Sequence, residues 1–373
     1  MHTMLVGIAA ILSLASATNA QTAGHPAPAQ LFESLSHQAD AARDAKRLDE
    51  ALTLYKRALK LQPSWEDGWW NAGNIAYDLD KYTECASDFR RFAALKPNLA
   101  PAWTLKGVCE YHLRDYDAAL KSLTRVQRLG FQENLELSRA ARLHLALVLS
   151  KLGYFEKAIV LLFDLTADER KTSEIIVAAG IAGLRKRWIP PEVPESERDK
   201  VFKLGDAIAN VMDPNYDVAI AKFEIATRDY PKEPEIHYRF GAFLMGNHPD
   251  RGIQEIKKSL ELDAGHLPAH LALAKIYIRR NEPQTALPYA QEAVKLSPKE
   301  FATHVVLGQA LLATGDAAGA VQEFELGVKL APYSSEAHYN LASAYGRMGR
   351  VADAAREREE SKRLRESSDS NPP

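Results

Sequence analysis

The chain has 373 residues, of which 46% are hydrophobic and 26% are charged, and its formal net charge is -2. This balance is typical of a soluble protein. It lacks the basic excess of a nucleic-acid-binding protein and the long acidic block of a charged, disordered tail, so both classes are excluded.

The first twenty residues differ in composition from the rest. Met4 to Ala17 is an uncharged apolar run, shorter than the roughly 20 residues of a membrane span, and small residues follow it up to Ala20. This pattern is typical of a secretory signal peptide over residues 1–20, which predicts an exported chain, periplasmic or secreted. Because the run is preceded by His2 and by no lysine or arginine, the alternative is a disordered or helical N-terminus of a cytoplasmic protein. Residues 21–30, rich in proline and alanine, are expected to form a flexible leader.

From residue 31 the sequence predicts four pairs of short amphipathic helices. Small and bulky apolar residues alternate at three- and four-residue steps, and proline or glycine punctuates the pairs. The residues that define the four pairs are Ala39, Ala51, Tyr55, Ala58, Pro63; Gly73, Cys85, Phe89, Phe92, Pro97; Gly107, Ala119, Leu123, Val126, Gly130; and Ala146, Gly153, Ala158, Leu162, Leu165.

The pattern then stops. One further helix, rich in small residues, is predicted from Glu174 to Trp188. It is followed by IPPEVPESER, where three prolines in five residues exclude a continuing helix. We expect residues 189–199 to be the most mobile interior segment, which would separate an N-terminal array at 31–188 from a C-terminal array at 200–366.

Five more pairs follow. Their defining residues are Ala207, Ala219, Phe223, Ala226, Pro231; Gly241, Gly252, Ile256, Ser259; Ala274, Ala286, Ala290, Ala293, Pro298; Gly308, Ala320, Phe324, Gly327, Pro332; and Ala342, Gly349, Ala354, Arg358. The last pair runs into a charged helix suited to cap the exposed end of an array. Residues 367–373 are expected to be a disordered tail.

The period of about 34 residues indicates stacked helix pairs. The pattern resembles the tetratricopeptide repeat family, with a large residue at position 4, small residues at 8, 20 and 27, a bulky one at 24 and proline at 32. The resemblance covers about residues 31–366. It implies an all-α fold, a right-handed superhelical solenoid of antiparallel helix pairs. The small residues allow helix axes to approach to about 8–10 Å.

No motif for catalysis, phosphate binding or zinc binding occurs in the sequence, so we expect no enzyme, no cofactor and no metal. Four histidines recur at position 4: His237, His270, His304 and His338. A metal site or proton relay is one interpretation, but equivalent positions in stacked repeats lie about 10 Å apart. Ligands of one metal ion lie about 2 Å from it. The favoured interpretation is an amphipathic filler between helices, where Trp69 and Trp103 lie in earlier repeats.

Cys85 and Cys109 are the two cysteines. They fall on neighbouring, antiparallel helices of the predicted array and could meet. In an exported protein, a disulfide between them could persist. The favoured interpretation is two separate small hydrophobic residues in the core.

In tetratricopeptide proteins the first helices line a concave face, which implies a peptide-binding site on the second and third repeats. The residues so implied are Asp67, Trp70, Asn74, Tyr77, Asp78, Thr104, Val108, Tyr111 and His112. Later repeats place Leu143, Leu147, Tyr238, Met245, Leu271, Lys275, Tyr339 and Arg347 on the same face. Trp69 is expected to point inward and Trp70 about 100° away, toward the groove. Members that clamp acidic C-terminal peptides carry lysine where Trp70 stands, so the aromatic set favours an extended or helical peptide bound by stacking. The alternative is that these rings pack against the adjacent repeat.

These observations predict a non-catalytic protein-interaction scaffold of the cell envelope that binds a peptide or protein segment in its concave groove. Its partner would be a protein, not nucleic acid, and the mature chain would have no membrane span. The alternatives are a self-assembling envelope component, or a non-catalytic subunit of an enzyme complex.

Overall fold

A computed structural model describes residues 28–130, 135–166 and 171–370. The predicted signal peptide lies outside these ranges. The first helix begins at Pro28, so the last three residues of the predicted leader are helical. The chain forms two compact units, Met1–Val148 and Leu149–Pro373. Each unit is described by itself.

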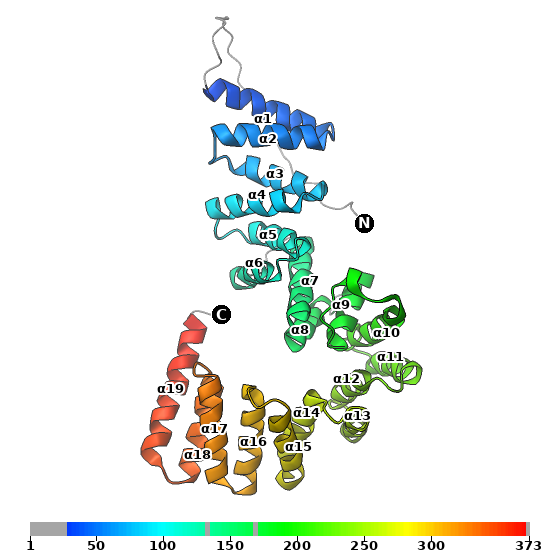
Figure 1. The fold of residues 1–373 in the computed structure, drawn as a ribbon, viewed down its shortest axis with the longest axis vertical. Helices are drawn as coiled ribbons and strands as arrows, with labels where there is room; N and C mark the ends of the chain where they lie inside the picture. The colour runs from blue at the N-terminus through cyan, green and yellow to red at the C-terminus, as the bar shows by residue number, and fades with distance from the viewer. Residues whose placement is uncertain (1–27, 131–134, 167–170, 371–373) are drawn as a thin grey trace, which may run out of the picture. The chain divides into compact units, whose positions relative to one another are not determined.

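The first unit is a stack of antiparallel helices (Figure 1). Its helices are α1 (Pro28–Asp44), α2 (Leu48–Leu61), α3 (Glu66–Asp78), α4 (Tyr82–Leu95), α5 (Ala100–His112), α6 (Tyr116–Leu129) and α7 (Leu135–Leu152), whose last residues belong to the second unit. Tyr55, Phe89 and Leu123, the residues predicted at position 24, are fully buried in its core.

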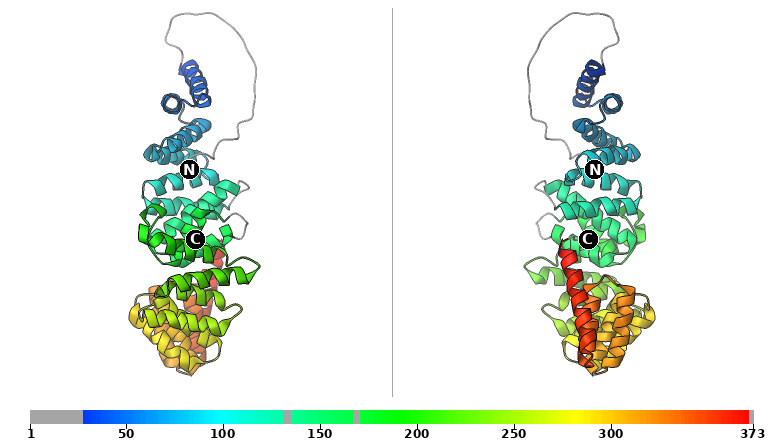
Figure 2. Two further views of the ribbon diagram at one scale, coloured as in Figure 1. Left: turned by 90° about the vertical axis from the view of Figure 1, so that its right-hand side faces the viewer. Right: turned by 90° about the vertical axis from the view of Figure 1, so that its left-hand side faces the viewer.

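The second unit continues the same construction. Its helices are α8 (Phe155–Thr166), α9 (Ser173–Gly183), α10 (Arg198–Ala209), α11 (Tyr216–Asp229), α12 (Pro234–Leu244), α13 (Pro249–Leu262), α14 (Leu267–Arg279), α15 (Pro283–Leu296), α16 (Phe301–Thr314), α17 (Ala317–Leu330), α18 (Ser335–Arg347) and α19 (Val351–Ser370). Figure 2 shows α19, in red, as a long helix at the end of the stack, where it packs on α18. Within the described residues the chain is helical and has no strand, so the predicted all-α class of stacked helix pairs is confirmed.

The small residues of the repeat are required by packing within each pair. The ring of Phe324 covers Gly308, and a Cβ atom at Gly308 would lie 2.5–2.9 Å from that ring. Phe89 covers Gly73 in the same way. Position 8 therefore has to be small because the bulky residue at position 24 occupies the space above it.

The ring at position 4 has a specific polar role in addition to packing. The indole N–H of Trp69 donates to the carbonyl oxygen of Pro63 at 2.8 Å, six residues earlier. The Nε2 atom of His304 makes the equivalent bond to Pro298 at 2.9 Å. Tryptophan and histidine can replace one another here because both present a ring N–H to the carbonyl group that ends the preceding repeat.

Three of the four histidines make a second bond from the other side of the ring. Their Nδ1 atoms lie 2.7 Å from carboxylate oxygens in the pairs His237–Glu255, His304–Glu323 and His338–Glu357. Because carbonyl and carboxylate oxygens both accept, both ring nitrogens of His237 donate. Burial opposes the charged ring, but the hydrogen bond to Glu255 and the bond to Pro231 raise the pKa of His237 above its ordinary value.

The structure contains a disulfide between Cys85 on α4 and Cys109 on α5. Their Cα atoms are 6.0 Å apart, a separation typical of bridged cysteines. The structure therefore agrees with the interpretation that the two cysteines form a disulfide, and not with two separate core residues.

The proline-rich segment differs from the expected mobile break. As the prolines require, it forms only two single 3₁₀ turns, at Pro190–Glu192 and Glu195–Glu197, until α10 begins at Arg198 and makes its last two residues helical. However, Ile189 and Val193 are buried. Lys151 on α7 binds Glu192 at 2.6 Å. The segment is therefore anchored rather than an exposed linker, and the boundary between the compact units lies elsewhere, after Val148.

The helices on either side of this segment cross in close contact. A Cβ atom at Gly180 of α9 would overlap the carbonyl oxygen of Val201. A Cβ atom at Gly205 of α10 would overlap the carbonyl oxygen of Ile176. Only glycine permits this approach, which explains the small residues of α9. α9 ends at Gly183, before the predicted Trp188, and Arg185 has a positive φ of 53°.

Two further findings concern the C-terminal helix and the question of a membrane-spanning helix. α19 continues to Ser370, so the backbone of the predicted disordered tail is helical for four residues, and 371–373 lie outside the described ranges. Among the described helices none combines the length and the apolar composition that crossing a bilayer demands.

Candidate peptide-binding surfaces

The nine residues predicted on α3 and α5 differ widely in exposure. Asp67, Asp78 and His112 are exposed, and Trp70, Asn74 and Tyr77 are half-buried. The other three, Thr104, Val108 and Tyr111, are buried. The Thr104 hydroxyl donates to the carbonyl oxygen of Ala100 at 3.1 Å, within its own helix. These three residues are thus not open to a ligand, contrary to the expectation for a groove.

Trp70 does not stand out toward solvent. Its ring lies 5.8 Å from the ring of Phe89 and 5.3 Å from that of Phe92, both on α4. Trp69 is half-buried as well, with its N–H bonded to Pro63. The expected contrast between an inward Trp69 and an outward Trp70 is therefore not found, because the second helix of the repeat provides a packing surface for Trp70.

Tyr77, Tyr111 and His112 do come together, in a cluster of rings that also includes Tyr82 and His144. We call these five residues the aromatic face. Tyr82 and His112 stack with centroids 4.4 Å apart, and Tyr111 lies 5.1 Å from His144. Tyr77 lies 5.9 Å from both Tyr82 and His112. The rings contact one another, as the packing alternative predicted.

Tyr82 and His144 were missed by the sequence analysis because they do not occupy the expected positions in first helices of the second and third repeats. Tyr82 opens α4, and its hydroxyl donates to Asp80 at 2.5 Å. Burial lowers the pKa of His144 to about 4, against the opposing bond to the carbonyl group of Ala140. His144 is thus neutral near pH 7.

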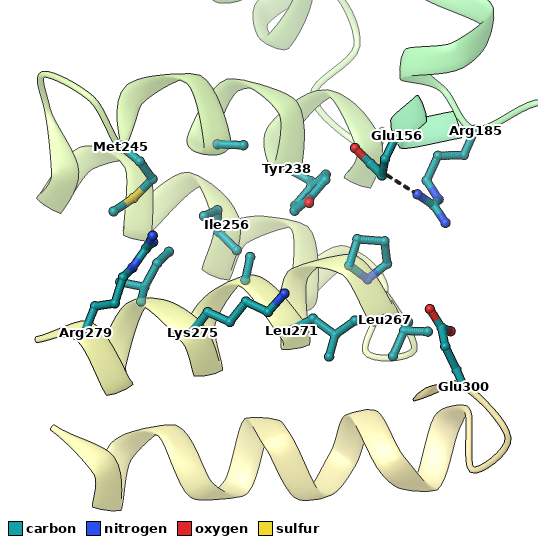
Figure 3. A pocket seen from close by; sticks show the side chains of 14 residues that line it. Glu156, Arg185, Tyr238, Met245, Ile256, Leu267, Leu271, Lys275, Arg279 and Glu300 are labelled. Carbon is teal, nitrogen blue, oxygen red and sulfur yellow. Dashed lines mark hydrogen bonds and ion pairs between the residues drawn. The ribbon is translucent and has the colours of Figure 1, made fainter. Parts of the chain in front are cut away.

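The second unit contains an open groove between α12 and α14, with a volume of about 450 Å³. We call it the α12–α14 groove. Tyr238 of α12 and Met245, directly after that helix, face Leu271 and Lys275 of α14 across it, and Ile256 of α13 forms its floor (Figure 3). The first four of these residues are at positions that the sequence assigned to the concave face. The groove has the size typical of a small ligand or peptide side-chain site.

One stripe of α14 changes from apolar to basic along the helix. Leu267, Leu271, Lys275 and Arg279 follow one another at four-residue steps and all line the groove. Lys275 and Arg279 are exposed. Within the described part of the chain, neither has a carboxylate within ion-pair distance. Glu300, at the Leu267 end of the groove, is likewise exposed and unpaired there.

Ion pairs between two arginines and Glu156 fix the end of the groove near α8. Arg239 of α12 is only 8% exposed. It binds both carboxylate oxygens of Glu156 on α8, each at 2.9 Å, and donates to the carbonyl oxygen of Gly183 at 3.3 Å. Arg185 adds a bond to Glu156 at 2.9 Å. Three elements, α8, the end of α9 and α12, are thereby held together.

This arrangement also perturbs the titration of Glu156. Burial opposes its charged form, but the hydrogen bonds and the charges of Arg239 and Arg185 prevail and hold the pKa of Glu156 below its ordinary value. A bidentate guanidinium–carboxylate pair is among the strongest and most directional contacts between side chains. The groove wall is consequently rigid at this end.

Within the part of the chain that the structure describes, there is no indication of a metal centre. In the ranges that it describes, no three or more His, Cys, Asp and Glu side chains gather as ion ligands would. The polar groups of both surfaces are suited to hydrogen bonds and ion pairs with a ligand.

Comparison with protein families finds tetratricopeptide repeats in both parts of the chain. Matches to families described as tetratricopeptide repeat cover residues 37–100, 71–132, 271–335 and 335–360. They include α3, α5 and all but the first four residues of α14, but none of α8–α13.

Among curated proteins, the chain is similar to the Protein SGT1 homologs of Bos taurus and Homo sapiens. The first is 33% identical over 104 residues, which are 28% of this chain and 30% of the bovine protein. The second is 30% identical over 82 residues, 22% of each chain. The chain thus spans less than a third of the length of these relatives.

Among solved structures, similar chains include "MamA 41-end from Desulfovibrio magneticus RS-1" and "Crystal structure of MamA protein". The first has 18% identity and a TM-score of 0.43 over 48% of this chain and 99% of its own. The second has 19% identity and a TM-score of 0.42 over 48% and 97%. A likeness of this size has no bearing on function.

Proposed function

We propose that this chain is an exported protein-interaction scaffold that binds one segment of a partner protein along the α12–α14 groove. The observation that carries the proposal is the groove itself, an open, mostly apolar hollow lined by successive first helices of stacked repeats. Support also comes from the tetratricopeptide matches, since this repeat serves protein binding.

Two observations support export. The apolar run and small residues of positions 1–20 have the pattern of a secretory signal. The disulfide between Cys85 and Cys109 is a bond that persists in oxidising compartments. Mass spectrometry of the native protein should find a mature N-terminus near Gln21. Recovery of an intact Met1 would contradict export.

A photo-crosslinking amino acid tests the groove in the native cell. We expect a partner to crosslink when this residue replaces Ala242, which is exposed in the groove. As a matched control, the same residue replaces Leu326, exposed on the second helix of a later repeat. Crosslinking at Leu326 alone would place binding elsewhere and contradict the proposal.

The predicted surface on α3 and α5 is a second candidate, because Asp67, Asp78 and His112 are exposed on it. Its shape differs from the groove, since the rings there fill the space between repeats and leave a contact surface rather than a hollow. A third crosslinker position at Asp78 distinguishes the two. Crosslinks at Asp78 without any at Ala242 would favour the N-terminal surface.

The self-assembling envelope component remains the rival function. It predicts oligomers of the purified mature chain that grow with concentration. Light scattering at several concentrations that gives the mass of one chain would exclude it.

A further inference from the structure

The α12–α14 groove has a direction. It follows α14 from Leu267 to Arg279. The 13 residues of this helix span about 20 Å at 1.5 Å per residue. A bound segment of that length contains about 12 residues as a helix or about 6 as an extended strand.

The two ends of the groove carry opposite charges. Lys275 and Arg279 occupy the half that ends beside Met245, and Glu300 lies at the other end, beside Leu267 (Figure 3). The remaining charged residues of the lining, Glu156 and Arg185, bind each other at 2.9 Å.

The charges that are left uncompensated are therefore two cations at one end and one anion at the other. Neither Lys275, Arg279 nor Glu300 has an ion-pair partner among the described residues. The uncharged walls are aromatic and aliphatic, with Tyr238, Met245 and Leu271 only half-buried.

We propose that the groove accepts an amphipathic protein segment with a fixed order of charge: side-chain carboxylates at one end, apolar residues in the middle, and a basic residue at the other end. The carboxylates pair with Lys275 and Arg279, the apolar side chains contact Tyr238, Met245 and Leu271, and the basic residue pairs with Glu300. The inference rests on the proposed function and specifies its partner. Opposite charges along the groove select the direction of binding, because the reversed segment places like charges together at both ends.

A displayed library of random segments of about 12 residues, the length of a helix that fills the groove, tests this pattern. The library is displayed internally, so that its members lack a free terminal carboxylate, and is selected against the full-length chain. We expect the selected segments to carry Asp or Glu on one side of an apolar centre and Lys or Arg on the other.

Charge-reversal variants connect the pattern to the residues. Lys275→Glu with Arg279→Glu should remove the preference for acidic residues and weaken the selected segments about tenfold or more. Glu300→Lys should remove only the preference for basic residues. Lys329→Glu is the matched control, because Lys329 is exposed on α17 outside the groove lining, and it should change neither preference. All four positions are exposed, and circular dichroism should confirm that each variant is folded.

A groove-filling variant, Ala242→Trp, separates the two claims. If the selected segments fail to bind Ala242→Trp, they bind in the groove and the groove function stands. If these segments also show no order of charge, the inference is overturned. Segments that bind Ala242→Trp as tightly as they bind the original chain would overturn both. The inference would also be overturned if the preference for acidic residues survived in the Lys275→Glu, Arg279→Glu variant. It would be overturned too if segments could be selected only from a library whose members have free terminal carboxylates.

Discussion

The aromatic face of the first unit and the α12–α14 groove of the second both contain residues that the sequence assigned to the concave face, but they arrange these residues in different ways. On the aromatic face, Tyr77 and Tyr111 each contact His112, and the rings of Tyr82 from α4 and His144 from α7 pack against them. In the groove, Tyr238 and Met245 face aliphatic residues and a lysine across a hollow. One surface is closed by its own side chains and the other is open.

This difference shows that the position in the repeat determines the direction in which a side chain points. Whether a ligand can reach that side chain depends on the side chains around it. In the groove, Ala242 and Ala272 line the wall between the larger residues and leave space. On the aromatic face, the rings of Tyr82 and His144 fill the space that such small residues would leave.

The largest effect should come from the disulfide of the first unit. Replacing Cys85 and Cys109 together with serine should lower the stability of the first unit by about 3.5 kcal/mol, since the bond closes a loop with a sequence separation of 24. Calorimetric unfolding measures the loss. Two titratable thiols in the unfolded, unreduced protein would show instead that the cysteines are not bonded.

Trp70→Ala tests whether the first unit is closed by packing. It should cost about 3 kcal/mol of unfolding free energy, because the ring packs on Phe89 and Phe92. Asp67→Ala, at an exposed position of the same helix, is the control and should cost less than about 0.5 kcal/mol. If urea unfolding gives the two variants equal stability, Trp70 is free to serve a ligand and the comparison fails.

Glu156→Gln tests whether the groove is held open by its ion pairs. Removing the carboxylate leaves Arg239 buried without a counter-ion, at a cost of about 2 kcal/mol, since Glu156 itself is partly exposed. Because the folded state lowers the pKa of Glu156, its contribution is present above the ordinary pKa of glutamate and is lost as the pH falls through the folded value. Urea unfolding from pH 3 to 7 should show this loss in the original chain and not in the variant. Glu300→Gln, which removes an exposed carboxylate with no ion-pair partner among the described residues, is the matched control.

The smallest effect concerns His237, whose pKa is raised in the folded state. A raised pKa contributes stability that is fully present below the ordinary pKa of histidine and is lost as the pH rises through the folded value. His237→Gln and Glu255→Gln should each remove this part of the pH dependence and about 1 kcal/mol at pH 6. Melting temperatures between pH 5 and 9 that decline equally in both variants and the original chain would contradict the assignment.

The sequence predicted the helix pairs, the small residues beneath Phe89 and Phe324, and the orientation of Tyr238, Met245, Leu271 and Lys275. All of these follow from a period that local side-chain sizes maintain. They require no knowledge of residues far away in the chain.

The predictions that the structure did not bear out concern contacts between residues that the repeat period does not relate. The packing of Trp70 depends on two phenylalanines of the second helix, and the ion pair between Glu156 and Arg239 joins residues 83 positions apart. The prolines correctly excluded an α-helix from residue 189 up to the start of α10 at Arg198, but they said nothing of Ile189 and Val193, whose burial anchors the segment. Burial of single apolar residues in an irregular segment has no periodic signature.

Position 4 is tryptophan in repeats of the first unit and histidine in repeats of the second, and this difference has a spectroscopic consequence. Four of the five tryptophans, Trp65, Trp69, Trp70 and Trp103, lie in the first unit, and Trp188 alone lies in the second. Intrinsic fluorescence therefore reports mainly on the first unit without any label. The imidazole proton resonances of His237, His270, His304 and His338 report on the second. Unfolding of the two units can thus be followed separately in one unmodified sample, by emission for the first and by nuclear magnetic resonance for the second.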